Sequence, residues 1–360
     1  MKISKPQTPS EVSDIINSSD KILPIGGCTK TGLFMSQEGV TVLDMTGIHG
    51  IEEYEPQEFT FTAKAGTKIS EVQFLLSKNG QFLPFDPLLA KNGATLGGTL
   101  ASGLSGPGRF HYGGIRDFIL GIKFINSKGE EVYSGGKVVK NAAGFDLPKL
   151  MVGSLGVFGV LVELTLKVLP KPEEYASLVI ELENLKEALQ IQTKLAASPL
   201  DLSALDLECF DGSYRLFVRI GGFGNTIRER SRRLQEFVGK GNLLNGDQEQ
   251  QLWEDVRELS WVPPDWSLVK VPLTPSRILE LEQRLAGKLF IRRYSCAGQV
   301  VLFSFKGSAD MMDKILNQIN LTGLLVFGKS NFRRLGVEAG SSFYRRVKSA
   351  LDPEGRFLEV

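Results

Sequence analysis

Two glycine-dense segments constrain this chain of 360 residues more than any other feature. Residues 92–108 read NGATLGGTLASGLSGPG, and residues 135–160 read GGKVVKNAAGFDLPKLMVGSLGVFGV. A glycine inside a helix costs roughly 1 kcal/mol relative to alanine, so a helical turn built on Gly97, Gly98 and Gly103 needs a compensating role. Close approach of the backbone to a ligand supplies one, because free amides at such a turn can hold a phosphate. A sheet of hairpins whose tight turns need glycine explains the same spacing.

The residues of both segments resemble a known group of flavoproteins. The run from Lys140 to Pro170, KNAAGFDLPKLMVGSLGVFGVLVELTLKVLP, is similar to the flavin-domain signature of FAD-binding proteins of the vanillyl-alcohol-oxidase (PCMH) type. Within that type it most resembles the FAD-binding subunits of bacterial glycolate oxidases. The runs ATLGGTLASGLSGP at 94–107 and RDFILG at 116–121 support the resemblance. It covers residues 1–170 well, and beyond them it rests on chain length and on the tail.

The resemblance implies an α+β fold with two domains. Residues 1–171 would form the two-lobed PCMH-type FAD-binding domain, with lobes over 1–85 and 86–171 and FAD between them. Over 172–330 the glycine density falls, and strands and helices follow a split β-α-β pattern that occurs twice. This pattern predicts an α+β cap domain with an antiparallel sheet and helices on one face. Residues 331–360 would return to the FAD-binding domain.

Local signals agree with a mixed first lobe. Thr8-Pro9-Ser10-Glu11 is a capping box with proline at the first helical position, which predicts a helix over 9–18. Ser70 and Gln73 form a second capping box, which predicts another helix. From Val160 to Val168 apolar and polar residues alternate, which is the period of a strand.

Composition excludes several classes of partner. The chain has 42 basic and 41 acidic residues and a net charge of +1, which argues against nucleic acid and against an anionic membrane surface. Three cysteines without a C-x-x-C spacing argue against a zinc site, an iron–sulfur cluster and a disulfide framework, so we expect no metal and a reducing cytoplasm. The longest apolar run, Met151 to Val162, is shorter than the ~20 residues that span a bilayer. No direct membrane insertion is therefore expected, and any membrane contact would come through partners.

The resemblance also assigns the FAD-binding residues. The loop that follows a strand at 22–25 resembles the family's pyrophosphate loop, although it lacks the G-x-G-x-x-G fingerprint. The predicted cofactor-binding residues are Pro24, Gly26, Gly27, Cys28, Thr29, Lys30, Thr95, Gly97, Gly98, Ser102, Gly103, Lys140, Asn141, Gly144, Asp146, Gly153, Ser154, Gly156, Gly159 and Val160. We expect FAD to bind without a covalent link, because Cys28 and His111 are the plausible attachment points and both have simpler roles.

Catalytic residues are harder to assign. Oxidation of a 2-hydroxy acid needs a hydride acceptor, a cation for the carboxylate and a base for the hydroxyl. The chain has only two histidines, His49 and His111, and lacks the histidine-rich metal motif that such subunits carry in the cap. His111, just after the glycines, is the predicted base. Arg116 is the predicted cation, together with Arg109. A pair with a local carboxylate such as Asp117 or Asp146, or a contact that steadies the flavin, also explains Arg116.

Two further groups of residues in the cap leave alternatives open. Arg292-Arg293 and Arg333-Arg334 each alternate faces, so one member of a pair would point to the flavin or both would be solvated. Trp253, Trp261 and Trp266 would form either a core or a docking patch for a partner.

The resemblance implies the FAD-binding subunit of a glycolate oxidase complex. It would oxidise a 2-hydroxy acid to a 2-oxo acid and pass electrons to a second flavin subunit and an iron–sulfur subunit. An alternative is an electron-relay or assembly module, because a chain with two histidines and no cysteine cluster would by itself oxidise glycolate slowly or not at all. A third hypothesis is a flavoenzyme similar to UDP-N-acetylenolpyruvoylglucosamine reductase, for which the match over Lys140–Leu147 is poorer.

Overall fold

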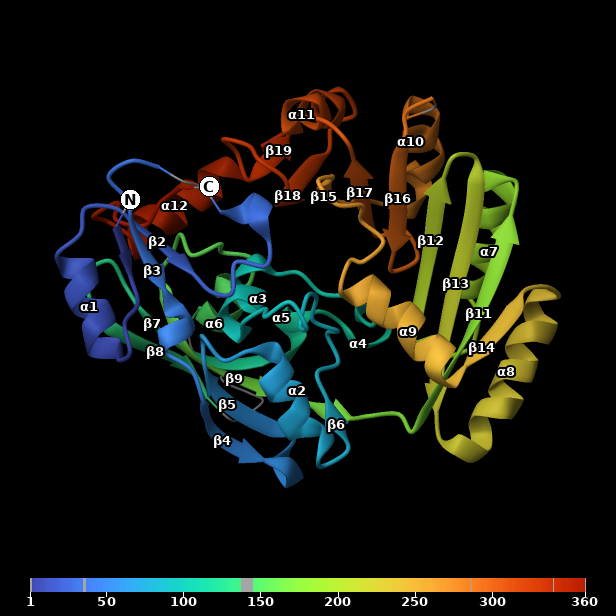
Figure 1. Ribbon diagram of the computed structural model, residues 1–360, viewed down its shortest axis with the longest axis horizontal. Helices are drawn as coiled ribbons and strands as arrows, with labels where there is room; N and C mark the ends of the chain where they lie inside the picture. Colours follow the sequence, from blue (N-terminus) through green and yellow to red (C-terminus); the bar gives the residue numbers. More distant parts are fainter. Residues whose placement is uncertain (1, 35–36, 137–144, 286, 339, 360) are drawn as a thin grey trace.

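The strands of this protein form sheets of three, five, two and nine strands in two parts that lie side by side (Figure 1). The structure is a computed structural model and describes residues 2–34, 37–136, 145–285, 287–338 and 340–359. The three smaller sheets contain residues of the N-terminal half, and the nine-stranded sheet begins at Glu174. This division explains why the glycine-rich stretches and the strand–helix repeats occupy different parts of the sequence.

The first lobe is built on a parallel sheet in the order β1-β3-β2. Its strands are β1 (Lys2–Ser4), β2 (Ile22–Ile25) and β3 (Thr41–Asp44). Helix α1 (Pro9–Asn17) begins as the capping box predicts, because the Thr8 side chain accepts a hydrogen bond from the amide of Glu11. The short 3-10 helices are η1 (Thr31–Leu33), η2 (Met45–Gly47) and η3 (Pro56–Glu58).

An antiparallel sheet in the order β4-β5-β9-β7-β8 joins this lobe to the glycine-rich segments. Its strands are β4 (Ile51–Glu55), β5 (Thr60–Lys64), β7 (Ile119–Ile125), β8 (Glu131–Gly135) and β9 (Val160–Lys167). The alternation after Val160 predicts β9 correctly. A two-stranded sheet of β6 (Gln81–Phe82) and β10 (Leu169–Pro170) lies beside it.

The helices of the second lobe are short. They are α3 (Leu96–Ser102), α4 (Arg109–Tyr112), α5 (Ile115–Phe118) and α6 (Leu147–Met151). The predicted cap at Ser70 is wrong, because the N-cap of helix α2 (Ile69–Ser77) is Lys68, which places Ser70 inside the first turn. Ile69 is fully buried and its amide bonds to the carbonyl of Ala94, so packing against the second lobe sets the start of the helix.

The nine-stranded sheet is antiparallel, in the order β14-β11-β13-β12-β16-β17-β15-β18-β19. Its strands are β11 (Glu174–Leu182), β12 (Ala204–Phe210), β13 (Ser213–Gly222), β14 (Asn242–Asn245), β15 (Ser267–Pro272), β16 (Phe290–Ser295), β17 (Val300–Phe305), β18 (Thr322–Phe327) and β19 (Arg334–Gly336). The sheet therefore continues past residue 330.

Most helices of this part cover one face of the sheet, as predicted. They are α7 (Leu185–Ala196), α8 (Gly224–Val238), α10 (Ile278–Arg284), which follows η4 (Pro275–Arg277), and α11 (Ala309–Gln318), and their apolar side chains share one core with the sheet. Helix α9 (Gly246–Arg257) is the exception, because Trp253 packs with Ala204 and Phe217 on the opposite face (Figure 1). The prediction of a single helix-covered face is wrong for α9.

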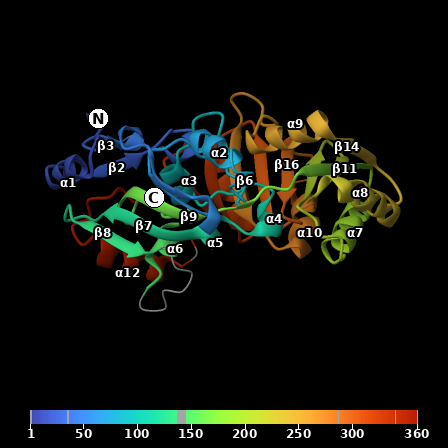
Figure 2. The same ribbon diagram turned by 90° about the horizontal axis from the view of Figure 1, so that it is seen from below.

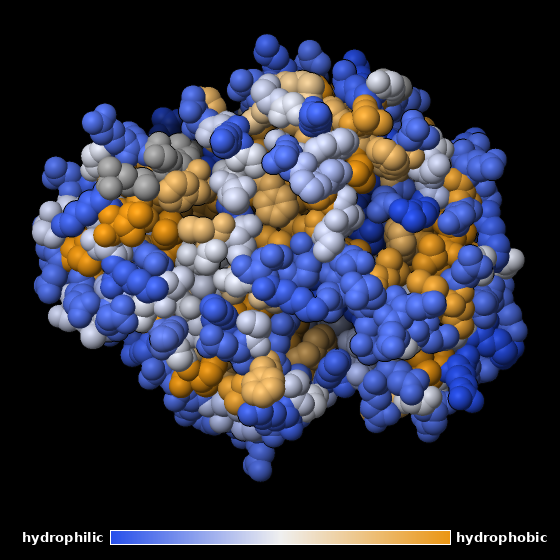
Figure 3. Space-filling model, in the orientation of Figure 1, coloured by the Kyte–Doolittle hydropathy of each residue, from blue (hydrophilic) through white to orange (hydrophobic). Residues whose placement is uncertain are grey.

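The surroundings of Trp253 decide whether this residue belongs to a core or to a docking patch. Its side chain is 0% exposed and its indole N–H donates to Ser177 Oγ at 2.7 Å, so Trp253 belongs to a core and offers no docking surface. Trp261 packs against the core of the first part. Hydrophilic side chains cover much of the face in Figure 3, and apolar side chains appear there in separate patches. None of the helices in the described ranges is long and apolar enough to cross a membrane.

The two parts share apolar contacts, and the C-terminal segment closes onto the first part. Leu268 and Val326 of the nine-stranded sheet pack in the same core as the helices of the second lobe. Figure 2 shows α4 at this junction. Helix α12 (Ser341–Leu351) packs Tyr344 on Phe158, and Phe357 pairs with Ile22 of β2. The tail therefore supports the strand that leads into the predicted pyrophosphate loop.

Candidate functional site

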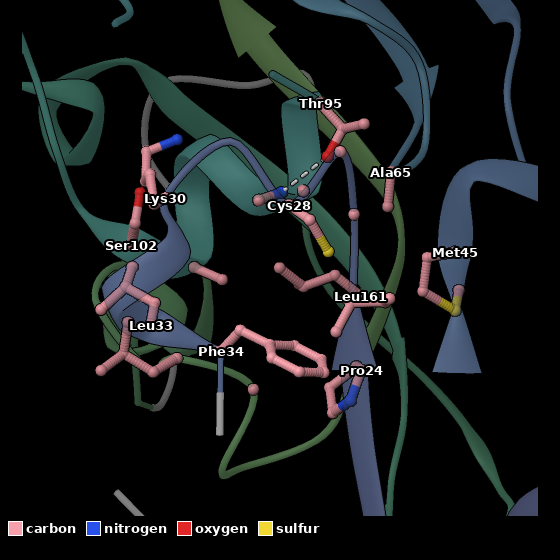
Figure 4. A pocket seen from close by; sticks show the side chains of 18 of the residues that line it. Pro24, Cys28, Lys30, Leu33, Phe34, Met45, Ala65, Thr95, Ser102 and Leu161 are labelled. Carbon is pink, nitrogen blue, oxygen red and sulfur yellow. Dashed lines mark hydrogen bonds between the residues drawn. The ribbon is translucent and has the colours of Figure 1, made fainter. Parts of the chain in front are cut away.

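A cavity lies where the loop after β2 meets helix α3 (Figure 4). The space between the atoms that line it is about 880 Å³, part of which is open to solvent. The lining residues are Leu23, Pro24, Ile25, Gly26, Gly27, Cys28, Thr29, Lys30, Leu33, Phe34, Met45, Ala65, Thr95, Gly97, Gly98, Ala101, Ser102, Leu155, Gly156, Gly159, Leu161 and Arg333. Both lobes and the end of the nine-stranded sheet thus contribute to one site.

The loop after β2 is held by close contact with the segment that precedes α3. A Cβ atom on Gly26 would overlap the hydroxyl of Thr95, and one on Gly27 would overlap the carbonyl of Gly93. Cys28 has a φ of 50°, a left-handed conformation in which non-glycine residues are uncommon. These glycines therefore let two backbone segments meet, which brings the loop amides to the start of α3.

Gly97 and Gly98 of helix α3 have different surroundings. A Cβ on Gly97 would lie 2.8 Å from Ala65 Cβ and 3.0 Å from Ala65 O, so this position packs directly against the first lobe. A Cβ on Gly98 would meet only Thr95 Oγ1, at 3.0 Å, and otherwise open space. The Thr95 hydroxyl caps the helix by accepting a hydrogen bond from the Gly98 amide at 3.3 Å (Figure 4). Gly98 alone of this pair leaves room for a ligand.

Two cations line the cavity without a carboxylate among the described lining residues. Lys30 is 8% exposed, and burial lowers its pKa to about 8. Among the described residues its Nζ contacts only Thr29 Oγ1, at 3.4 Å. Arg333 is 1% exposed and donates from Nη1 to the carbonyl of Leu155 at 3.3 Å. Its Nε and Nη2 have no partner among the described residues, and burial lowers its pKa to about 10. Buried charges are costly unless paired, so the cavity is built for an anion.

The cavity fits the cofactor that the sequence predicts. Backbone amides of the loop, Lys30 and Arg333 suit a pyrophosphate, and the apolar side chains of Phe34, Met45 and Leu161 suit flat rings. Figure 4 shows Lys30 and Ser102 on one side of the cavity, with Leu33 beside them, and Met45 on the other side. A lining that combines cations with apolar side chains suits a molecule that has both phosphates and aromatic rings, such as FAD.

Many of the predicted cofactor-binding residues line the cavity. They are Pro24, Gly26, Gly27, Cys28, Thr29, Lys30, Thr95, Gly97, Gly98, Ser102, Gly156 and Gly159. Gly103, Gly153, Ser154 and Val160 are not among the lining residues; Gly103 ends α3 with a φ of 62°, and Val160 belongs to a core. Asp146 is exposed and caps α6. Lys140, Asn141 and Gly144 lie outside the described residues.

Several lining residues were not predicted. Phe34, Met45, Ala65 and Leu161 carry no motif, because an apolar residue beside a cavity has the same sequence pattern as a core residue. Arg333 did carry a signal, since the alternation of Arg333 and Arg334 predicts that one of them points inward. Arg333 is buried in the cavity wall, whereas Arg334 is exposed.

The predicted catalytic residues do not line this cavity. His111 is exposed, and its Nδ1 lies 3.4 Å from Asp201 Oδ1 of the cap. Arg116 is also exposed and donates from Nη1 to the carbonyl of Lys149 at 2.7 Å. Arg109, the other predicted carboxylate ligand, lines a second cavity against the nine-stranded sheet. The roles of His111 and Arg116 in catalysis remain predictions.

Comparisons with known proteins point to the same cofactor. The sequence profile of the FAD binding domain family matches residues 2–134. Glycolate oxidase subunit GlcE of Escherichia coli is 36% identical over 69% of this chain and 67% of its own length. Glycolate oxidase subunit GlcD of Bacillus subtilis is 31% identical over 56% of this chain and 44% of its own length. D-lactate dehydrogenase of Anaerostipes hadrus is 32% identical over 46% of this chain.

The matched lengths differ between these relatives. The match spans about two thirds of GlcE but only 44% of GlcD and 33% of the D-lactate dehydrogenase. Among solved structures, an alkyldihydroxyacetonephosphate synthase superimposes on 98% of this chain with a TM-score of 0.71, at 15% sequence identity and over 75% of its own chain. At that identity the superposition shows a shared fold.

Proposed function

The chain belongs to the FAD-binding family of the glycolate oxidase subunits, and we propose that it oxidises a 2-hydroxy acid to a 2-oxo acid with bound FAD. The observation that carries this proposal is the 36% identity to GlcE over 69% of the chain. FAD, when bound, supplies the acceptor for the hydride. The named activities of the other relatives favour this function over an electron-relay module, since they include D-lactate dehydrogenases and a D-2-hydroxyglutarate dehydrogenase.

The residues of the first cavity have three roles in this proposal. Lys30 and Arg333 neutralise the phosphates, and the amides after β2 donate to phosphate oxygens. Gly98 leaves space for the cofactor beside α3. The apolar wall of Phe34, Met45 and Leu161 excludes water from the rings.

The proposal includes an assembly. Two of the relatives are named as subunits of glycolate oxidase, which implies a complex of more than one chain. We infer that the partners here are a second flavin subunit and an iron–sulfur subunit, as the resemblance of residues 140–170 to the FAD-binding subunits of glycolate oxidases implies. A cytoplasmic location, with membrane contact only through these partners, belongs to the same proposal.

Anaerobic mixing of the FAD-loaded chain with a hydroxy acid tests the function. We expect glycolate or D-lactate to bleach the visible flavin absorbance, slowly in the isolated chain and faster in the complex. Dithionite should bleach the same flavin at once, as a control for accessibility. If dithionite reduces the flavin but neither acid does so, even in the complex, the chain does not oxidise these acids. That result would favour the electron-relay function. Rapid bleaching by NADPH instead would favour the reductase hypothesis.

A single substitution tests the predicted base. We expect His111→Ala to retain flavin reduction within about threefold of the wild type, because the imidazole is exposed and pairs with Asp201 rather than lining either cavity. General-base catalysis contributes about 10²- to 10⁴-fold, so loss of the true base gives a much larger effect. The measurement is the rate of anaerobic bleaching at saturating acid. A fall of a hundredfold with normal FAD content would establish His111 as the base.

A further inference from the structure

A second cavity lies at the junction of the two parts, and we call it the junction cavity. One wall is the segment Leu104–Arg109, which follows α3, and the other is the face of the nine-stranded sheet opposite helices α7, α8, α10 and α11. The space between its lining atoms is about 460 Å³, part of which is open to solvent. The sheet contributes Asp206, Lys270, Arg293, Ser295, Val300 and Leu302, and Cys296 follows β16 directly. Polar and apolar side chains therefore line the same small cavity.

Strand register explains why charged side chains meet in the junction cavity. Glu208 on β12 lies opposite Arg293 on β16, Arg293 lies opposite Leu302 on β17, and Leu302 lies opposite Lys270 on β15. Residues directly opposite one another in an antiparallel sheet project from the same face. Val269 and Val271, on either side of Lys270, pack in the core on the other face. Arg293 and Lys270 therefore both face the first part of the molecule.

The positive charges of the junction cavity outnumber their partners. Arg293 is 1% exposed and forms ion pairs with Asp206 at 3.0 Å and Glu208 at 3.3 Å, yet its Nη2 has no partner among the described residues. The side chains of Lys270 and Arg109 form no hydrogen bond or ion pair with the described part of the chain. Burial, and then the charge of Arg109, lower the pKa of Lys270 to about 8. Lys270 and Arg109 thus have no counter-ion within the described ranges of the chain.

We propose that the junction cavity binds the carboxylate of a small organic acid between Arg109, Lys270 and the free Nη2 of Arg293. The apolar side chains Leu88, Leu104 and Val300 would contact the carbon atoms of the acid. The buried carboxylate of Asp206 disfavours an anion of high charge, and the small volume disfavours a long chain. Lys270 lies inside β15, which pairs with β17 on one side and with β18 on the other. These paired strands fix the position of the Lys270 backbone.

The place of the junction cavity in the chain connects it with the first cavity. Ser102 lines the first cavity, and Leu104, two residues later, lines the junction cavity. Gly103, in the left-handed conformation, turns the chain between them. Since this inference rests on the proposed function, the acid is the 2-hydroxy acid substrate, and the cap supplies the cation for its carboxylate through Lys270 rather than through Arg116.

Binding of oxalate to the FAD-loaded protein tests this site, because oxalate is a small carboxylate without a hydroxyl to oxidise. Calorimetry should show oxalate binding to the wild type and at least a tenfold higher Kd in Lys270→Met and in Arg109→Met. Arg109 is exposed, so its substitution keeps the test valid should Lys270→Met fold poorly. Lys288→Met and Arg228→Met, at exposed positions of the cap, are matched controls and should bind oxalate as the wild type does.

The outcomes separate this site from the proposed function. No oxalate binding by the wild type, or equal binding in both variants, would overturn the site. Inorganic phosphate bound as tightly as oxalate would overturn the assignment to a carboxylate. If oxalate binds as expected but no 2-hydroxy acid reduces the flavin, the carboxylate site stands and the proposed function fails. If an acid reduces the flavin with the same KM in the wild type and in both variants, the function stands and the site is overturned.

Discussion

Gly98→Leu is expected to give a folded protein that contains less than a tenth of the wild-type FAD. The new side chain would start beside Thr95 Oγ1, 3.0 Å from its Cβ, and otherwise extend into the open space of the cavity. Leucine gains roughly 1 kcal/mol over glycine in a helix, which offsets a weakened threonine cap worth about 1 kcal/mol. The thermal midpoint of the apoprotein should therefore stay within a few degrees. FAD content per folded chain is read from the visible absorbance.

Gly97→Ala is the matched control, because it adds a smaller side chain at the neighbouring position. Its Cβ would lie 2.8 Å from Ala65 Cβ and 3.0 Å from the Ala65 carbonyl. Overpacking of this kind costs typically 1–3 kcal/mol, so the thermal midpoint should fall while the folded fraction keeps its FAD. Stoichiometric FAD in Gly98→Leu would show that the space beside α3 does not hold the cofactor. Loss of FAD without loss of stability in Gly97→Ala would contradict its assignment to packing.

This contrast shows how far the glycine pattern alone can be interpreted. The density of glycine in residues 92–108 predicts a close approach, and the structure has several. Gly26, Gly27, Gly97 and Gly156 are required by contacts within the chain: a Cβ on Gly156, which has a φ of 81°, would lie 2.6 Å from Pro24 Cγ. A sequence cannot separate chain–chain approach from chain–ligand approach, because both demand a residue without a Cβ.

Capping motifs predicted a helix start correctly where hydrogen bonds within the first turn set it. They failed where packing against distant residues sets the start of the helix. The Thr8 capping box marks α1 because its hydrogen bond lies within one turn. The Ser70 box did not set the start of α2, where the buried Ile69 meets the second lobe. The sequence pattern predicts the helices on one face of the cap sheet, whereas α9 lies on the other face, where Trp253 packs against Phe217. These contacts join residues that are distant in the sequence.

Some residues of the candidate site could be predicted from the local sequence, and others could not. The loop around Lys30 could be predicted, because its residues are contiguous and resemble the pyrophosphate loop of the family. Lys270 and Arg293 lie on strands β15 and β16 and reach the junction cavity through strand register, and Arg333 lies just before β19. Pairing between strands that are distant in the chain cannot be read from the sequence. The alternation of faces in Arg292-Arg293 was correct: Arg292 forms an ion pair with Glu282 at 2.8 Å, whereas Arg293 faces the junction cavity.

The affinity of the apoprotein for FAD is expected to fall about 30-fold between pH 7 and pH 9.5, because Lys30 must be charged to bind a phosphate. Burial lowers the pKa of Lys30 to about 8 in the free cavity. A bound phosphate raises this pKa again, since an opposite charge favours the protonated amine. The contribution is therefore complete below pH 8 and is lost as the pH rises from 8 towards the pKa of the complex. The measurement is the Kd of FAD by fluorescence titration.

The free energy of unfolding of the apoprotein should rise with pH because of Lys30, whereas the affinity for FAD falls. Above pH 8 the unfolded chain keeps a proton on Lys30, because the ordinary pKa of a lysine is 10.5, while the folded apoprotein releases it. Stability rises with pH where the unfolded state binds more protons, by about 2 kcal/mol between pH 8 and pH 9.5. Lys30→Met removes both effects, and so its difference from the wild type isolates Lys30 from other groups that titrate in this range.

Two variants make the pH prediction specific to one of the two cavity cations. Lys30→Met should bind FAD about 10- to 100-fold more weakly at pH 7, the loss expected for one hydrogen bond to a charged group, and its Kd should no longer change with pH. Arg333→Met should also weaken binding, but it should keep the wild-type slope because Lys30 still titrates. Since the pKa of Arg333 is about 10, that guanidinium stays charged over most of the range. An unchanged slope in Lys30→Met would show that Lys30 does not contact the phosphates.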